Sequence, residues 1–234
     1  MQTKYLVLKV EAMKPFIIIE DVEFKYKRSN NIFQGLSLTI YSDETTAITG
    51  KNGSGKTTLS KLAAGMLHPQ KGRVIVDGED IRGMSLGKLG NKLGYVFQAV
   101  ERQLFGMTVI DELTFVQKLK GVDESEANMK AQELLNNFEL AKLKERHPST
   151  LSYGEKRRLA IAATLISNPR FLILDEPTSF LDPDRITHLS AVLDSLKKEG
   201  IGMLIISHDD EFIEQHADRI IRLAEGSVED DYRP

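Results

Sequence analysis

Cysteine is absent from this sequence of 234 residues. Disulfide bonds and thiolate metal sites are therefore excluded, because both need a cysteine sulfur. An excess of positive charge is also lacking, since Lys and Arg total 31, Asp and Glu total 34, and the formal net charge is −3. Nucleic-acid-binding proteins usually carry a basic excess or a basic patch. We therefore expect no nucleic acid among the partners.

Long apolar segments are lacking as well. No run in the sequence approaches the roughly 18–20 apolar residues that a membrane-spanning helix needs. Residues 1–14 have a short apolar centre without a small-residue cleavage site, so we do not expect a signal peptide there. These residues are treated as an N-terminal extension of undefined role. Any role at a membrane must then come through a separate partner.

Strand and helix patterns alternate along the rest of the chain. Short runs rich in β-branched and aromatic residues predict strands at 15–26, 36–40, 45–50, 72–81, 92–98, 171–175 and 202–207, and a strand pair near 219–229. Asp77 and Gly78 are expected to form a hairpin turn within 72–81. Helical spacing predicts helices at 56–67, 108–119, 124–138, 152–167, 183–198 and 210–216. Such alternation implies an α/β fold with a mostly parallel sheet flanked by helices, and the first strands are expected to be antiparallel.

The predicted organisation is one domain over 15–234. Within it, the segment of about 99–152 has good helix formers at helical spacing and little strand signal. We therefore expect a helical subdomain inserted into the α/β core at this point.

A glycine-rich loop follows the predicted strand at 45–50. Gly50–Thr57, "GKNGSGKT", fits the pattern G-x-x-x-x-G-K-[ST] at every position. Glycines let the backbone amides converge on a phosphate chain, while Lys56 can reach the β- and γ-phosphates and Thr57 can bind Mg²⁺. A glycine turn that only caps a helix is the simpler alternative, but the preceding strand and the Lys-Thr pair favour a nucleotide site. The predicted ligands are ATP and Mg²⁺.

A pair of acidic residues ends the buried strand "FLILD". Asp175 stands at the carboxyl end of this strand, and Glu176 follows it. Ligands of open α/β sheets bind at this edge, so Asp175 can hold Mg²⁺ and Glu176 can act as general base on an attacking water. Two solvated acids would be the better interpretation of this pair alone. Its combination with the phosphate loop favours catalysis.

The segment "LSYGE" begins another predicted helix. Ser152 and Glu155 have the spacing of a capping box. Capping alone is a sufficient structural explanation for such a pair. Ser152 and Gly154 at a helix start can also form a second phosphate-binding end that contains no lysine.

With these motifs in this order, the chain resembles the nucleotide-binding subunits of ABC transporters from about residue 16 to residue 228. This resemblance implies a P-loop NTPase fold and a role for each matching residue. The nucleotide-binding positions are Tyr26 (stacked on adenine), Lys51, Asn52, Gly53, Ser54, Gly55, Lys56, Thr57 and Thr58 of the Walker A loop, and Ser152 and Gly154 of the signature motif, which act on a partner's ATP. The implied catalytic residues are Glu176, His208 (the switch histidine) and Gln98 (the Q-loop); the implied Mg²⁺ ligands are Thr57, Gln98 and Asp175.

The signature motif departs from the family pattern at two positions. The family commonly has L-S-G-G-Q, whereas Tyr153 stands here at a glycine position and Glu155 at the glutamine position. Ser179–Asp182, "SFLD", is similar to the family's D-loop.

The stretch from Gly94 to Phe115 resembles the ATPases of energy-coupling factor importers, which take up vitamins or transition-metal ions. That resemblance implies a second ABC ATPase subunit, identical or related, with two ATP molecules sandwiched head to tail. It also implies a transmembrane coupling subunit and a substrate-binding membrane protein, and a peripheral location on the cytoplasmic face of the cell membrane.

Two other functions remain open. One is a non-transport ABC ATPase that acts on nucleic acid or the ribosome, although the segment between Lys56 and Asp175 is too short for the long coiled coil of chromosome-associated members. The other is a regulatory module that binds nucleotide without hydrolysing it. The intact Lys56, Asp175, Glu176 and His208 argue against the second.

Overall fold

The computed structural model describes residues 13–27 and 31–234. The predicted N-terminal extension therefore lies outside the described residues except for Met13 and Lys14. The strands in the described ranges are β1 (Pro15–Phe24), β2 (Phe33–Tyr41), β3 (Thr45–Thr49), β4 (Lys71–Val76), β5 (Glu79–Asp80), β6 (Leu93–Val96), β7 (Phe171–Asp175), β8 (Gly202–Ile206), β9 (Arg219–Ala224) and β10 (Ser227–Tyr232). The α-helices are α1 (Lys56–Ala63), α2 (Leu86–Leu89), α3 (Val109–Leu119), α4 (Glu124–Asn137), α5 (Tyr153–Leu165), α6 (Pro183–Lys198) and α7 (Asp210–His216).

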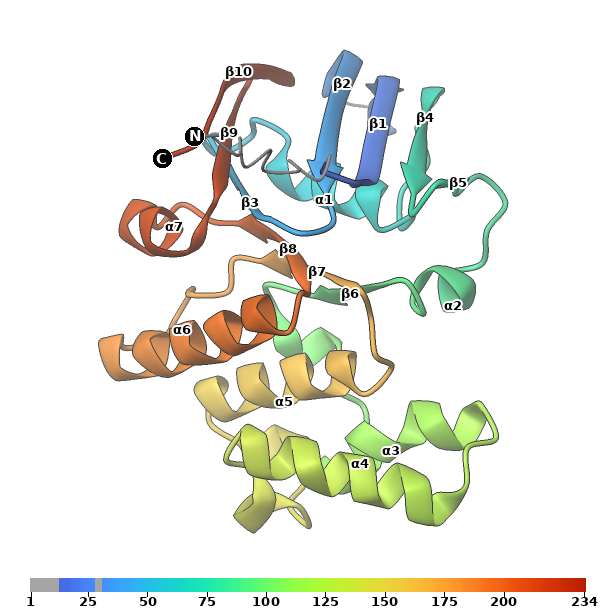
Figure 1. The fold of residues 1–234 in the computed structure, drawn as a ribbon, viewed down its shortest axis with the longest axis vertical. Helices are drawn as coiled ribbons and strands as arrows, with labels where there is room; N and C mark the ends of the chain where they lie inside the picture. The colour runs from blue at the N-terminus through green and yellow to red at the C-terminus, as the bar shows by residue number, and fades with distance from the viewer. Residues whose placement is uncertain (1–12, 28–30) are drawn as a thin grey trace, which may run out of the picture.

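The strands form two sheets (Figure 1). The four-stranded sheet has the order β2-β1-β4-β5, and its strands pair antiparallel. The six-stranded sheet has the order β10-β9-β3-β8-β7-β6, in which β10 alone pairs antiparallel with its neighbour. The predicted α/β class, with a mostly parallel sheet and antiparallel N-terminal strands, is confirmed.

Strand β7, which lies between β8 and β6, shows how both faces of the parallel sheet are covered. Every residue of Phe171–Asp175 is buried. Successive side chains of a strand point to opposite faces, and Phe171 and Ile173 belong to a hydrophobic core shared with β1, β2 and α1. Leu172 and Leu174 belong to the second core, shared with α3 to α6. The continuous apolar run is thus explained by burial on two sides.

Two local expectations changed. The helix predicted to reach Leu67 ends at Ala63, because Gly65 adopts the left-handed conformation, with φ of 66°, that terminates helices. The single-turn helix α2 had no predicted counterpart. The turn predicted at Asp77 and Gly78 does join β4 to β5, and both residues have positive φ (50° and 77°), as a two-residue hairpin turn requires.

The chain between β6 and α5 is helical throughout its regular elements. Besides α3 and α4 it contains three single 3₁₀ turns, η1 (Val100–Arg102), η2 (Ala141–Leu143) and η3 (Pro148–Thr150). Figure 1 places α3 and α4 at the end of the molecule opposite the antiparallel sheet. The division of the chain into a core and a helical subdomain stays a prediction.

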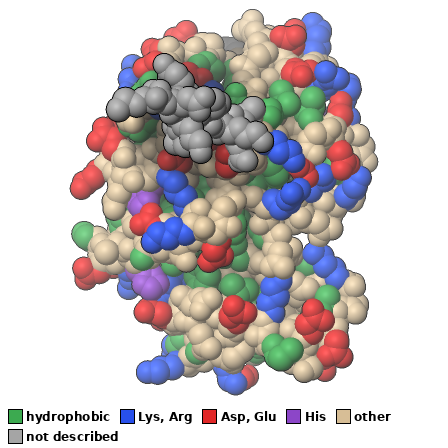
Figure 2. Space-filling view, in the orientation of Figure 1, with side chains coloured by type: hydrophobic (Ala, Val, Ile, Leu, Met, Phe, Trp, Pro, Cys, Tyr) green, Lys and Arg blue, Asp and Glu red, His purple; other side chains and the backbone are tan. Residues whose placement is uncertain are grey.

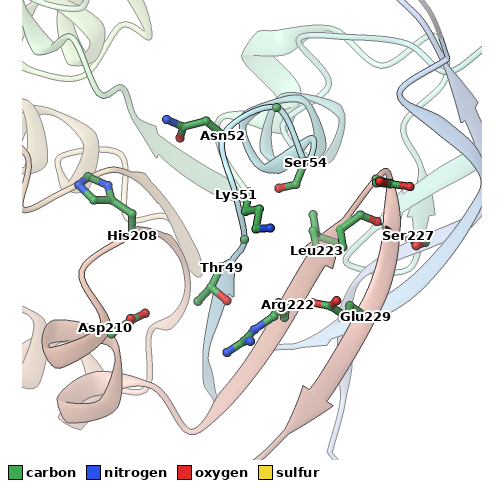
Figure 3. Close-up of a pocket in the computed structure, with 14 residues that line it drawn as sticks. Thr49, Lys51, Asn52, Ser54, His208, Asp210, Arg222, Leu223, Ser227 and Glu229 are labelled. Atoms are coloured by element: carbon green, nitrogen blue, oxygen red, sulfur yellow. Dashed lines mark hydrogen bonds between the residues drawn. The ribbon is translucent and has the colours of Figure 1, made fainter.

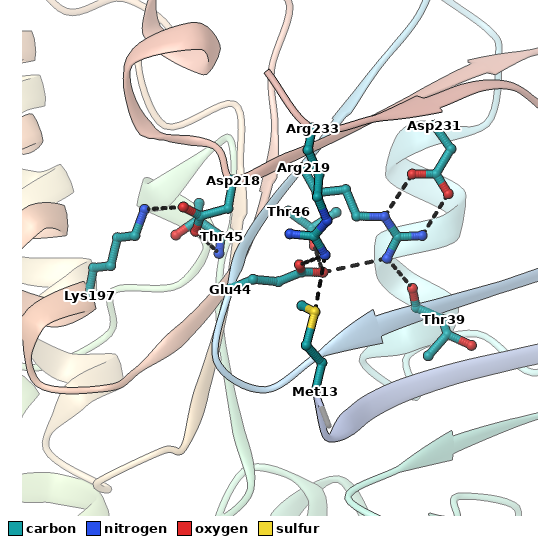
Figure 4. Close-up of polar contacts among 10 residues, drawn as sticks. All are labelled: Met13, Thr39, Glu44, Thr45, Thr46, Lys197, Asp218, Arg219, Asp231 and Arg233. Atoms are coloured by element: carbon teal, nitrogen blue, oxygen red, sulfur yellow. Dashed lines mark hydrogen bonds and ion pairs between the residues drawn. The ribbon is translucent and has the colours of Figure 1, made fainter. Parts of the chain in front are cut away.

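A buried acidic residue ties the last strands to the core (Figure 4). Glu44, only 3% exposed, accepts hydrogen bonds from Thr46 Oγ1 at 3.0 Å and Arg233 Nη2 at 2.6 Å. Arg219 lies 3.5 Å from the same carboxylate, pairs with Asp231 and donates to the carbonyl of Thr39 at 2.8 Å. A buried charge needs such partners, and they hold β10 in place beside β9.

Among the described residues, none of the helices is long and apolar enough to span a bilayer. On the face drawn in Figure 2, Lys and Arg side chains are interspersed with Asp and Glu side chains. That face therefore offers no broad basic surface of the kind that binds nucleic acid.

Candidate functional site

A cavity of about 950 Å³ opens where the glycine-rich loop leaves β3. Its lining comes from that loop, from the start of α7 and from the β9–β10 hairpin, and Figure 3 shows the labelled side chains arranged around it. The lining residues are Thr49, Gly50, Lys51, Asn52, Gly53, Ser54, His208, Asp210, Arg222, Leu223, Ala224, Glu225, Ser227 and Glu229. The volume lies in the range of small-molecule sites.

Gly50 shows why the loop needs glycine. Its φ is 137°, in the region that L-residues rarely adopt. A Cβ at this position would lie 2.2 Å from the carbonyl oxygen of Leu223. The loop can therefore pass this close to β9 only without a side chain.

The loop and the start of α1 suit an anion. Lys56 is 8% exposed, and its Nζ donates to the carbonyls of Gly50 at 2.7 Å and Lys51 at 3.2 Å. Ser54 is 5% exposed, and its Oγ has no hydrogen-bond partner in the described part of the chain. An ammonium group, an unpaired hydroxyl and the first amides of a helix together fit a phosphate chain.

Two of the three expected Mg²⁺ ligands, Thr57 and Asp175, come together. Thr57 Oγ1 donates to Asp175 Oδ1 at 3.5 Å, and the hydroxyl of Tyr95 donates to Asp175 Oδ2 at 3.1 Å. Burial raises the pKa of the Asp175 carboxyl, although the hydrogen bond from Tyr95 opposes this shift. The described ranges contain no group of three or more His, Cys, Asp or Glu side chains placed to hold a metal ion by themselves. The oxygen pair nevertheless fits Mg²⁺, which usually takes one or two protein carboxylates and completes its shell with water and phosphate.

Tyr95 belongs to the site although no motif in the sequence points to it. It lies on β6, is 7% exposed, and its hydroxyl is 2.9 Å from Ser60 Oγ as well as bonded to Asp175. Burial raises the pKa of the Tyr95 hydroxyl, which therefore stays protonated and able to donate. A tyrosine in an apolar strand pattern does not indicate its contacts with Ser60 and Asp175, because α1 and β7 are both distant from β6 in sequence.

The expected base and switch histidine are in contact. Glu176 Oε2 and His208 Nδ1 lie 2.7 Å apart. The Glu176 carboxylate is largely buried, with 11% of the side chain exposed, whereas 69% of the His208 side chain is exposed. Glu176 has a φ of 51°, and its amide donates to the carbonyl of Ile206 at 2.8 Å. Left-handed backbone in a residue other than glycine is held by its surroundings and is frequent at functional sites.

Tyr26, the expected adenine-stacking residue, lies beside α1. Its hydroxyl is 3.4 Å from Thr58 Oγ1, and its ring packs edge-on against Phe24 with ring centroids 5.1 Å apart. The side chain is therefore next to the helix that begins at the phosphate loop.

The signature residues lie apart from this chain's own loop. Ser152 caps α5, and the capping box is confirmed: Ser152 Oγ accepts from the amide of Glu155 at 3.4 Å, and Glu155 Oε2 accepts from the amide of Ser152 at 2.7 Å. Gly154 borders a small second cavity, of about 10 Å³, with Leu181 and Arg185. Gln98 has an exposed side chain just after β6.

Arg222 and the other β9–β10 residues in the cavity lining were also missed. A strand pair was predicted there, but its neighbour in the sheet was not. The parallel pairing of β3 with β9 sets Arg222 beside Thr49 and so brings the hairpin to the loop. Only the strand order of the sheet contains this information.

Comparison with known proteins agrees with the site. Residues 33–179 match the model of the ABC transporter family. The energy-coupling factor transporter ATP-binding protein EcfA1 of Thermotoga maritima is 36% identical over 213 residues, which cover 91% of this chain and 80% of that protein. A relative in Treponema denticola is 36% identical over 94% of this chain, but the chain spans only 43% of that relative's length.

Solved structures show the same fold. The cbiO1 protein of Clostridium perfringens is described as part of the ABC transporter complex cbiONQ. It superposes with a TM-score of 0.85 at 32% identity, over 94% of this chain and 89% of the cbiO1 chain. The cassette MJ0796, in a dimeric post-hydrolysis state with ADP and phosphate, gives 0.82 at 27% identity and covers 93% and 98%. The chain therefore belongs to the ABC transporter family, as an ATPase cassette.

Proposed function

We propose that this chain binds and hydrolyses ATP to power an importer of the energy-coupling factor type, which carries vitamins or transition-metal ions. The observation that carries hydrolysis is the contact between Glu176 and His208, at the edge of the sheet where Thr57 and Asp175 also meet. The type of importer is supported by the similarity to EcfA1 and to cbiO1.

The residues divide the chemistry between binding and proton transfer. Lys56 and the loop amides hold the phosphate chain, and Tyr26 offers a ring for the adenine. When bound, Mg²⁺ held by Thr57, Asp175 and Gln98 would neutralise phosphate charge. The carboxylate of Glu176 accepts the proton of the attacking water, and His208 holds that carboxylate from 2.7 Å.

A second ATPase subunit, either a copy or a relative of this chain, completes each site. Ser152 is exposed and Gly154 borders a different cavity from the one at the phosphate loop. Both features support the view that these signature residues act on the ATP of a partner. The dimeric state of the similar cassette MJ0796 supports the same arrangement.

An exposed apolar patch offers a docking surface for the transmembrane coupling subunit. It consists of Phe105, Met107, Phe115 and Leu119, which are 62%, 73%, 43% and 71% exposed. Phe105 and Phe115 pack edge-on with centroids 5.1 Å apart. Exposed apolar clusters of this kind mark sites that another molecule covers. Such a partner would place the chain peripherally on the cytoplasmic face of the membrane.

A buried carboxylate fixes the loop that carries part of the patch. Glu112 on α3 is 4% exposed, and its Oε2 accepts the amides of Phe105 at 2.7 Å and Gly106 at 2.6 Å. Burial raises the pKa of this carboxyl, while the two amides lower it. The loop that carries Phe105 is therefore fixed against the helix that carries Phe115.

The catalytic proposal is tested by steady-state ATP hydrolysis of the complex purified with its membrane partners. Glu176→Gln keeps the shape of the side chain and removes the base, so kcat should fall by roughly 100-fold or more. Glu214→Gln, an exposed substitution on α7, is the matched control and should hydrolyse ATP at the wild-type rate. Equal turnover by the Glu176→Gln variant and the wild type would refute the catalytic role.

The importer proposal is tested by co-purification from detergent-solubilised membranes with Mg-ATP. We expect tagged wild-type chain to recover a membrane coupling protein, and Phe105→Asp with Phe115→Asp to lose it while still binding ATP. Met129→Asp, at an exposed apolar residue of α4 outside the patch, is the control. Recovery of ribosomal or DNA-associated proteins alone would contradict the transport role.

A further inference from the structure

Tyr153 is the position where the signature departs most from the family pattern. It is the first residue of α5, directly after the cap Ser152. Its hydroxyl donates a hydrogen bond to the backbone carbonyl of Gln98 at 2.8 Å. A glycine at this position has no side chain, so a chain with the common L-S-G-G-Q sequence cannot form this bond.

Arg157 reinforces the same contact from one helical turn further along. Its Nη2 donates to the Gln98 carbonyl at 3.1 Å and to the Tyr153 hydroxyl at 3.1 Å, and Nη1 donates to the carbonyl of Phe97 at 3.0 Å. The guanidinium carbon lies 5.4 Å from the centre of the Tyr153 ring. Residues four apart on a helix share one face. Tyr153 and Arg157 therefore both donate hydrogen bonds to the backbone of the Q-loop from the same face of α5.

Arg157 is buried to an unusual degree for a charged residue. It is 1% exposed, and burial lowers the pKa of its guanidinium. The side chain also reaches the turn after β7, where Nη2 lies 3.4 Å from the carbonyl of Glu176. A buried charge is retained only where several groups satisfy it. Here those groups are backbone carbonyls at the ends of β6 and β7, together with the Tyr153 hydroxyl.

The D-loop meets the same ring. Phe180 packs edge-on against Tyr153 with centroids 5.6 Å apart, has a φ of 63° and is 80% exposed. The side chain of Tyr153, on the signature helix α5, thus contacts both the Q-loop and the D-loop. These three segments are far apart in sequence.

We propose that Tyr153 is a positioning residue for Gln98: its hydroxyl fixes the Gln98 peptide and couples the signature helix to the Q-loop. This inference rests on the role proposed above for Gln98 toward Mg²⁺. The direction in which the Gln98 side chain leaves the backbone follows from the orientation of its peptide, because φ and ψ are the soft dihedrals at that residue. Tyr153 therefore acts through Gln98 and not on the nucleotide of its own chain.

Tyr153→Phe tests the hydroxyl without the ring, because phenylalanine keeps the packing on Arg157 and Phe180. Hydrogen exchange is measured on the isolated chain, with Tyr232→Phe on exposed β10 as the control. Loss of one hydrogen bond should speed exchange of the segment 97–103 about five-fold, equivalent to about 1 kcal/mol. Amides outside this segment should exchange as in the wild type.

Turnover is then measured on the complex with its partners. We expect Tyr153→Phe to lower kcat roughly three- to ten-fold and to leave KM for ATP unchanged, because Lys56 and the loop amides, which hold the phosphate chain, are not altered by the substitution. Tyr232→Phe should leave both parameters unchanged. Failure of the proposed catalysis itself is detected separately, since Glu176→Gln would then hydrolyse ATP like the wild type.

Three outcomes would overturn the inference. Unchanged exchange at 97–103 would mean that the hydroxyl does not hold the Q-loop. Faster exchange over the whole chain would mean that Tyr153 serves stability alone. A drop in turnover without a change in exchange would mean that Tyr153 acts directly on the partner's nucleotide.

Discussion

Beside the phosphate loop, hydroxyl groups of single residues donate hydrogen bonds to the carboxylate of Asp175. Asp175 receives a hydrogen bond on each carboxylate oxygen, from Thr57 and from Tyr95, and Tyr95 in turn meets Ser60. Groups that orient a metal ligand in this way usually matter nearly as much as the ligand itself. The local chemistry at Asp175 therefore extends to a residue on β6 that has no motif of its own.

Removing the Tyr95 hydroxyl should weaken metal binding. In Tyr95→Phe the ring stays in the core and one orienting bond to Asp175 is lost. We expect the Mg²⁺ concentration for half-maximal ATP hydrolysis to rise about ten-fold. The measurement is a Mg²⁺ titration at saturating ATP. Tyr41→Phe on β2 is the control, and an identical Mg²⁺ requirement in wild type and Tyr95→Phe would refute the role of Tyr95.

At the scale of elements, α7 is anchored to α6 through a buried histidine. His216 is 5% exposed, its Nε2 lies 2.8 Å from Ser190 Oγ, and its Nδ1 lies 3.2 Å from Asp194 Oδ1. Burial lowers the pKa of His216, although Asp194 opposes the shift. Because α7 begins two residues after His208, this anchor also holds the end of the segment that carries the switch histidine.

Stability should therefore depend on pH through His216. Its folded-state pKa lies below the usual value of 6.5, so the unfolded chain binds more protons between these two values. The free energy of unfolding should fall as pH is lowered from about 7 through the folded-state pKa, and the contribution should level off below it. Urea unfolding between pH 5 and pH 8 measures this.

His216→Leu provides the comparison. This variant should lose that part of the pH dependence and about 1–2 kcal/mol at pH 8, because Ser190 is left buried without its partner. His68→Gln, at an exposed histidine, should keep the wild-type slope. A wild-type slope in His216→Leu would show that another group is responsible.

The whole molecule combines the cavity at the phosphate loop with the surfaces proposed above for other chains. The loop follows the carboxyl end of β3, and Asp175 and Glu176 lie at the carboxyl end of the parallel strand β7. The helices α3 and α4 lie at the end of the molecule opposite the antiparallel sheet (Figure 1). The signature residues Ser152 and Gly154 are not among the residues that line the cavity at the loop. Nucleotide binding alone should therefore be a property of one chain, whereas turnover should need its partners.

Mg-ATP should stabilise the isolated chain. At a ligand concentration of 100 times Kd, a site that exists only in the folded state adds about 2.7 kcal/mol. For a domain of this size, Tm should rise by roughly 5–10 °C. Lys56→Ala should abolish the rise, and Lys71→Ala, at the exposed first residue of β4, should keep it. The measurement is thermal unfolding with and without Mg-ATP, and an equal rise in Lys56→Ala would contradict binding at this loop.

The sequence by itself determined the class of the fold and the family, and it predicted the phosphate loop. Gly50–Thr57 implies a phosphate loop because its glycines, Lys56 and Thr57 stand at short fixed spacings within one local segment at the start of α1. The capping box at Ser152 and the turn at Asp77 and Gly78 are local for the same reason. Apolar runs such as 171–175 predicted buried parallel strands because only strands covered on both sides need them.

Tertiary structure alone decided which distant residues meet. Tyr95 reaches Asp175, and Tyr153 with Arg157 reaches Gln98, through the order of strands in the sheet and the packing of α5 against it. Such contacts depend on crossovers between segments that are far apart in the chain, and no local periodicity encodes them. The position of Arg222 beside the phosphate loop has the same origin, since β9 pairs with β3 although most of the chain lies between these two strands.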